Sequence, residues 1–142
     1  MKVVLERLYG AQFQATNEDG KTLRLAGAPD IGPSEDGLRP MQALLASLAG
    51  CSAIDVLHIL NKQKHRVDRL DVVVDGERAS TIPAVFTKIH MRFVGAGDFP
   101  LHTLERAVAL SADKYCSVSF MLRPTVEITH SVELVDGAAT PE

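Results

Sequence analysis

The sequence predicts an α+β fold in which helices pack on antiparallel strands. Segments that alternate apolar and polar residues are typical of strands with one solvated face. Such segments flank a long run of helix formers at residues 41–64, which carries a wide apolar stripe. With 142 residues and no internal repeat, the chain fits a single domain, 1–142, that can bury a core without disulfide bonds.

The N-terminal region predicts a β-hairpin followed by a loop. Residues 2–15 and 21–26 form the two predicted strands, and the Asn-Glu-Asp-Gly segment between them supplies the positive φ of a tight turn. Residues 27–40 are rich in Gly and Pro and show no apolar period, so we expect an ordered surface loop.

The central helix is predicted from Met41 to about Lys64. Its apolar stripe consists of Leu44, Leu45, Leu48, Ile54, Leu57 and Leu60. The cations of residues 61–66 mark its end, because positive charge complements the C-terminal end of the helix dipole.

The second half of the chain predicts a strand pair, a helix, a short helical turn and a last strand. The strands are expected at 70–80 and 84–95, and the second alternates Val85, Ile89, Met91 and Phe93 with Lys88, His90 and Arg92. A helix is expected at 97–115, with Leu101, Leu104, Val108 and Ala112 facing inward. Residues 116–122 predict the helical turn and 125–135 the last strand, with His130 on its apolar side. Residues 135–142 predict a loose tail.

Charge and cysteine content exclude several classes of protein. The 15 basic and 18 acidic residues give a net charge of −3 without a polybasic face, so we expect no nucleic-acid partner. No basic N-terminal segment precedes a long apolar run, so we expect a soluble, cytoplasmic protein with no membrane partner. The two cysteines are far apart and form no CxxC motif, so we expect neither a disulfide scaffold nor a metal, and no cofactor.

The chemistry is therefore expected at the two thiols. On a helix, Cys51, Asp55 and His58 lie at i, i+4 and i+7, along one face. A base beside the cysteine would raise its thiolate fraction. Alternatively, the two polar residues satisfy each other or a neighbouring chain, while the thiol packs as a small apolar group. At Cys116 the start of the predicted helical turn would favour a thiolate, which makes this cysteine the slightly preferred reactive thiol.

Longer motifs resemble a known family. GPSEDGLRPMQALLASLAGCSAIDVLHIL, the pair GERA and PAVFTKIHMRF, and LERAVALSADKYCSVSFML occur in this order. Together they resemble the OsmC/Ohr family (osmotically inducible protein C and organic hydroperoxide resistance protein), in particular its OsmC-like branch, over residues 10–134. The resemblance implies a bacterial protein of the oxidative stress response that forms an intertwined homodimer with its central helices buried in the middle.

The resemblance also implies a thiol-dependent peroxidase that reduces organic hydroperoxides with a dithiol reductant. Cys51 would be the peroxidatic thiol, which attacks the O–O bond, releases an alcohol and becomes a sulfenic acid. Cys116 would be the resolving thiol, which then closes a disulfide. This assignment reverses the preference drawn from local reasoning. Asp55 and His58 would then hydrogen-bond within the dimer core or at its edge rather than activate the thiol.

The sequence departs from the family pattern at the start of the central helix. Family peroxidases place an arginine and a glutamate beside the peroxidatic thiol, and this chain has Gln42 in the glutamate position. An amide can hold an arginine by a hydrogen bond but supplies no charge. Arg39 and Arg24 are candidates for the arginine by sequence proximity only. Two functions therefore remain: a weakened thiol peroxidase, and an OsmC-like stress-associated protein that binds an apolar small molecule without peroxidase turnover.

Overall fold

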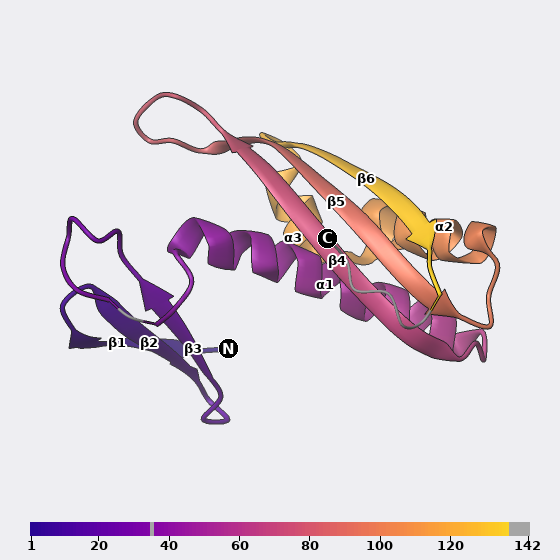
Figure 1. The fold of residues 1–142 in the computed structure, drawn as a ribbon, viewed down its shortest axis with the longest axis horizontal. Coiled ribbons are helices and arrows are strands. Elements are labelled where there is room, and N and C mark those ends of the chain that lie inside the picture. The colour runs from indigo at the N-terminus through magenta and orange to yellow at the C-terminus, as the bar shows by residue number, and fades with distance from the viewer. Residues whose placement is uncertain (35, 137–142) are drawn as a thin grey trace. The chain divides into compact units, whose positions relative to one another are not determined.

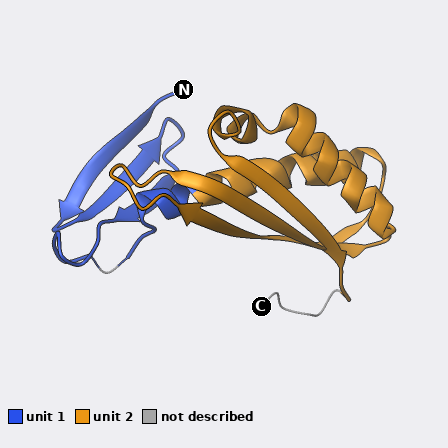
Figure 2. Cartoon of the chain, turned by 90° about the horizontal axis from the view of Figure 1, so that it is seen from above, with its two compact units in different colours: residues 1–44 blue, residues 45–142 orange. Residues whose placement is uncertain are grey.

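The structure, a computed structural model, describes residues 1–34 and 36–136. The chain divides into two compact units, residues 1–44 and residues 45–142, coloured separately in Figure 2. Most of the tail predicted at 135–142 lies outside the described residues. That the whole chain forms one domain stays a prediction.

Residues 1–44 contain a three-stranded antiparallel sheet in the order β1 (Val3–Tyr9), β2 (Gln12–Asn17), β3 (Thr22–Ala26). The single strand predicted at 2–15 is wrong, because the chain reverses at Gly10, whose φ of 48° is left-handed. The turn predicted between the next two strands is confirmed. There the Asn17 side chain accepts hydrogen bonds from the backbone N–H groups of Asp19 and Lys21 at 3.0 and 2.8 Å.

Helix α1 (Pro40–Lys62) agrees with the predicted central helix to within two residues at each end. Pro40 occupies the first helical position, where its missing N–H costs nothing. The Gln42 side-chain oxygen accepts a hydrogen bond from the backbone N–H of Arg39 at 2.9 Å, which is one half of a capping box. At the other end Lys64 adopts a φ of 64° and the His65 N–H bonds to the Leu60 carbonyl, which closes the last turn.

Residues 45–142 contain the second sheet, in the order β4 (Val67–Arg78), β5 (Phe86–Gly97), β6 (Glu127–Leu134) (Figure 1). Strands β4 and β5 pair antiparallel, as predicted. Strand β6 pairs parallel to β5, so the expectation of antiparallel strands is wrong at this one position. The physical reason is the helical connection between them, which carries the chain back to the beginning of β5, as a parallel pair requires.

The helical connection changes its hydrogen-bond period just before the second cysteine. Helix α2 (Leu101–Leu110) runs into a π-helical turn, η1 (Ser111–Tyr115), in which the Cys116 N–H bonds to the Ser111 carbonyl at 2.9 Å. Helix α3 (Ser117–Leu122) confirms the predicted helical turn. The helix predicted at 97–115 is thus shorter than expected, and Leu101, expected to face inward, is exposed because it opens α2.

The core of the second unit lies between its sheet and the helices, which cover one face of that sheet (Figure 2). Its fully buried apolar side chains include Leu48, Val56 and Leu60 of α1, Ile89, Met91, Phe93 and Val94 of β5, and Leu104, Ala107 and Val108 of α2. The predicted alternation is therefore confirmed for Ile89, Met91 and Phe93, whereas Val85 precedes β5 and is exposed. His130 pairs with the buried Met91 of β5 and therefore lies on the predicted apolar side of β6, but it is exposed because β6 is an edge strand.

Helix α1 carries more apolar surface than its own chain covers. Leu48 and Leu60 of the predicted stripe are buried, whereas Ile54 is 69% exposed and Leu57 is 40% exposed. By length and composition alone α1 could cross a membrane, a test that core helices of soluble proteins also pass. The described residues of this chain thus leave part of the apolar surface of α1 uncovered.

Candidate functional site

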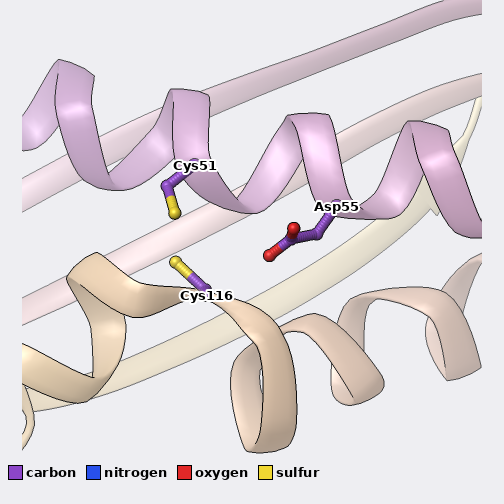
Figure 3. A group of neighbouring side chains, drawn as sticks. All are labelled: Cys51, Asp55 and Cys116. Carbon is purple, nitrogen blue, oxygen red and sulfur yellow. The ribbon is translucent and has the colours of Figure 1, made fainter.

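The two cysteines come from distant segments and meet beside α1 (Figure 3). Cys51 lies in the middle of α1, and Cys116 lies between the π-helical turn and α3. Their sulfur atoms and a carboxylate oxygen of Asp55 all lie within 4.8 Å of one another. Both cysteines are free thiols, and a disulfide needs a sulfur separation of about 2 Å. The two sulfurs are therefore neighbours that are not bonded in this structure.

Cys116 is held in a closed environment. Its side chain is fully buried, and its sulfur accepts hydrogen bonds from the Ser52 hydroxyl at 3.3 Å and from the Ser119 backbone N–H at 3.4 Å. Its extended backbone, with φ −69° and ψ 102°, separates the π-helical turn from α3 and aims the thiol at α1. By contrast, the Cys51 side chain is half-buried.

The surroundings of Cys116 oppose its ionisation. Burial raises the pKa of its thiol, because a thiolate is poorly solvated in an apolar interior. The hydrogen bonds from Ser52 and Ser119 act in the lowering direction, and the neighbouring Cys51 raises the pKa further through a hydrogen bond and its charge. The net effect is a raised pKa, so Cys116 holds its proton at neutral pH.

Asp55 is linked to the segment that carries Cys116. Its carboxylate accepts a hydrogen bond from the Ser111 hydroxyl at 3.2 Å, and the same hydroxyl lies 3.5 Å from the Ser52 carbonyl oxygen. Ser111 opens the π-helical turn, and its carbonyl accepts the Cys116 N–H. The helical spacing of Cys51 and Asp55 predicted their proximity, and the predicted helix start at Cys116 accounts for the Ser119 N–H bond, whereas no local pattern pointed to Ser52 and Ser111. The only sequence signal for these two residues is the concentration of serines around both cysteines.

A pocket of about 470 Å³ adjoins this group on the side of Asp55. It is lined by Asp55, His58, Ile59, Lys62, Gln63, Leu110 and Tyr115. His58 therefore shares a pocket wall with Asp55, as the i, i+3 spacing on α1 requires, and its side chain is exposed. Asp55 is the residue common to the pocket and to the cysteine pair.

The other three predicted site residues make contacts within residues 1–44. Arg24 forms an ion pair with Asp36 at 3.1 Å on the surface. Arg39 donates its backbone N–H to the side chain of Gln42, so this glutamine acts as a helix cap. A role for any of the three in activating Cys51 stays a prediction.

The cysteine pair and Asp55 also have the donor types that bind a thiophilic cation. Two sulfurs and a carboxylate oxygen within 4.8 Å would supply three of the four ligands of a tetrahedral Zn²⁺ site. The expectation that no metal is used stays a prediction.

Comparison with known proteins identifies the family. Residues 32–131 match the family model described as OsmC-like protein. The chain belongs to the OsmC-like family. The matched range contains both cysteines, Asp55 and the serines around them, and the resemblance inferred from the sequence motifs is confirmed.

Relatives of this OsmC-like chain extend over nearly its whole length. Protein YhfA of Escherichia coli (strain K12) is 38% identical over 137 residues, which cover 95% of this chain and 98% of YhfA. The crystal structure of a hypothetical protein from Aquifex aeolicus VF5 is 32% identical, with a TM-score of 0.79 and coverage of 95% of this chain and 97% of that one. An organic hydroperoxide resistance protein OsmC from Legionella pneumophila is 21% identical, with a TM-score of 0.69 and coverage of 94% and 97%. This last likeness shows the shared fold and confirms the α+β, OsmC-like class.

Proposed function

We propose that this OsmC-like protein is a thiol-dependent peroxidase that reduces organic hydroperoxides with Cys51 and Cys116. The observation that carries the proposal is the meeting of two free sulfurs within 4.8 Å from segments far apart in the sequence. Two thiols that become one disulfide supply the two electrons that convert one hydroperoxide into an alcohol and water.

In the first step the Cys51 thiolate attacks the terminal oxygen of the hydroperoxide. The O–O bond breaks, the alkoxide takes a proton and leaves as an alcohol, and Cys51 becomes a sulfenic acid. The difference in exposure favours this assignment, because Cys51 is half-buried and Cys116 is fully buried. The family resemblance assigns the same roles.

In the second step Cys116 attacks the sulfenic sulfur of Cys51. The S–S bond forms, the S–O bond breaks, and the hydroxide leaves as water. A dithiol reductant then restores both thiols by thiol–disulfide exchange. Because both cysteines are free thiols, a reducing compartment such as the cytoplasm suits this cycle.

The protein is proposed to act as a homodimer. The uncovered Ile54 and Leu57 of α1 and, in the first unit, the exposed Val3 and Leu5 of β1 are apolar surfaces that a second copy would bury. Obligate dimers of this kind bury more than about 2,000 Å² in total.

A second function, the binding of an apolar small molecule without turnover, is favoured by the pocket beside Asp55. Its volume of about 470 Å³ is within the range of small-molecule sites, and Ile59, Leu110 and Tyr115 give it apolar walls.

One experiment separates the two functions. Reduced protein is mixed with cumene hydroperoxide and dithiothreitol, and the remaining hydroperoxide is measured over time, with mass spectrometry of both cysteines. We expect the wild type to consume hydroperoxide and Cys51→Ser to abolish consumption, while Ser117→Ala, next to Cys116 but exposed, behaves as the wild type. If folded protein keeps both thiols reduced under hydroperoxide, the peroxidase proposal fails and ligand binding replaces it.

A further inference from the structure

Closure of the disulfide poses a proton-transfer problem at Cys116. Only a thiolate is an effective nucleophile toward the oxidised Cys51, and the Cys116 thiol is fully buried. Bulk water therefore does not reach its proton directly. The Ser52 hydroxyl and the Ser119 N–H donate hydrogen bonds to its sulfur and so stabilise the thiolate once it has formed.

The Asp55 carboxylate is placed to take this proton. One of its oxygens lies within 4.8 Å of both sulfurs, a distance that one small side-chain movement or one bridging water covers. Figure 3 shows the carboxylate on the same side of α1 as the two thiols, next to Cys116.

Ser111 fixes the carboxylate in this position. Its hydroxyl donates to Asp55 at 3.2 Å, and its carbonyl accepts the Cys116 N–H at 2.9 Å. One residue thus ties the carboxylate and the thiol to the same π-helical turn. Ser111 is a positioning residue, because it touches Asp55 rather than the reacting sulfurs.

We propose that Asp55 accepts the Cys116 proton when the disulfide with Cys51 closes, and then gives a proton to the departing hydroxide. The Cys116 S–H bond breaks, and its proton passes to the carboxylate. The thiolate attacks the Cys51 sulfur, the S–S bond forms and the S–O bond breaks. The carboxylic acid then protonates the hydroxide to water, so Asp55 ends the step unchanged. This inference rests on the proposed peroxidase function only for the identity of the oxidised form of Cys51.

The test uses a mixed disulfide, so that closure is observed without hydroperoxide. Reduced protein reacts with 5,5′-dithiobis(2-nitrobenzoate) at Cys51, which releases one thionitrobenzoate. Attack by Cys116 then releases a second, and both releases are followed by absorbance at 412 nm. Cys116→Ser should show the first release only, which assigns the second phase to closure.

In Asp55→Asn the rate of the first release, at Cys51, should stay within about threefold of the wild-type rate. The rate of the second release, which reports closure, should fall at least tenfold, since a positioned base contributes a factor of about 10² or more. Asparagine retains an oxygen that can accept from Ser111, so the fold is expected to persist. Asp55→Glu should recover part of the closure rate. Ser111→Ala should slow closure less than Asp55→Asn does, with the first phase unchanged.

Asp113→Asn is the matched control, because it removes one carboxylate from the same π-helical turn and Asp113 is exposed. It should close as fast as the wild type. The proposal would be overturned if the closure rate of Asp55→Asn were within twofold of the wild-type rate. It would also be overturned if Asp113→Asn slowed closure as much as Asp55→Asn does.

Hydroperoxide then tests the link to the proposed function. With cumene hydroperoxide, Asp55→Asn should accumulate a Cys51 sulfenic acid that dimedone traps, in larger yield than the wild type. If no variant is oxidised by hydroperoxide and the mixed-disulfide assay still depends on Asp55, the peroxidase proposal fails while the proton-transfer role stands.

Discussion

At the residue scale, the two thiols differ in burial although their sulfurs are neighbours. Cys116 is enclosed by α1, the π-helical turn and α3, whereas Cys51 is half-buried on α1. An alkylating reagent must reach the sulfur and needs it as a thiolate. Burial limits access to Cys116, and its raised pKa lowers its thiolate fraction. The order of reactivity therefore follows from the enclosure of one sulfur.

Cys51 is accordingly expected to react before Cys116. In reduced, folded protein at pH 7.5, iodoacetamide should modify Cys51 at least tenfold faster, as measured by peptide mass spectrometry of timed samples. In about 6 M guanidinium chloride the two rates should converge, because unfolding removes the difference in burial. Faster modification of Cys116 in the folded protein would contradict the proposed roles.

The raised pKa of Cys116 also predicts a pH dependence of stability. The folded chain holds this proton more tightly than the unfolded chain, whose thiol ionises near the ordinary value of about 8.5. The stabilisation is complete below that pH and is lost as the pH rises through the higher folded pKa. The free energy of unfolding of the reduced protein should thus fall above about pH 8.5.

Urea denaturation of reduced protein between pH 7 and pH 10 measures this fall. Cys116→Ala should be less stable at every pH because of the cavity, but its stability should decrease less steeply above about pH 8.5. The comparison of slopes removes the contribution of other groups that titrate in the same range. Parallel slopes in the two proteins would show that Cys116 does not titrate differently on folding.

At the element scale, the features that depend on neighbouring residues were predicted better than those that depend on packing between distant segments. Helix α1 was predicted to within two residues because its helix formers and the cations at its end act locally. The break at Gly10 was missed because a lone glycine in an alternating segment gives a weak signal. Within the site, the spacing of Cys51 and Asp55 on the helix predicted that these two side chains lie close together. The hydrogen bonds from Ser111 to Asp55 and from Ser52 to Cys116 depend on how a distant segment packs, which no local period encodes.

The start of α1 gives a prediction that separates the capping role of Gln42 from a catalytic one. Gln42→Ala removes the acceptor for the Arg39 N–H and should lower the free energy of unfolding by about 0.5–1 kcal/mol. Gln42→Glu keeps an acceptor and adds negative charge at the helix N-terminus, so it should be as stable as the wild type or more stable.

Urea denaturation measures both variants, and Gln63→Ala, just past the other end of α1, is the matched control and should change stability less. We also expect Gln42→Glu to raise the rate of hydroperoxide consumption, because it restores the charge of the family pattern. If Gln42→Glu is more stable than the wild type but consumes hydroperoxide at the same rate, Gln42 acts only as a helix cap. If Gln42→Glu is less stable than the wild type, the capping role is contradicted.

At the scale of the whole molecule, uncovered apolar surface is the main feature that a single chain leaves unexplained. Along α1 the buried residues Leu48, Ser52, Val56 and Leu60 recur every fourth position and face the core of their own chain. Ile54 and Leu57 lie between them on another side of the helix and remain exposed. The sequence predicted one wide stripe, because composition does not distinguish the surface that packs within the chain from the surface that packs outside it.

A second copy of the chain is the expected cover, and a charge on this surface should prevent its binding. Wild-type protein at micromolar concentration should scatter light as a particle of twice the 15.4 kDa chain mass. Ile54→Asp should shift this mass toward that of one chain, because a buried unpaired carboxylate costs several kcal/mol at an interface. The Ile54→Asp substitution should leave the core of the chain intact, since Ile54 is 69% exposed in the single chain. Lys88→Asp places the same acid on the solvated face of β5 and should stay dimeric. A monomeric wild type would refute the dimer, and a dimeric Ile54→Asp would move its interface away from this face of α1.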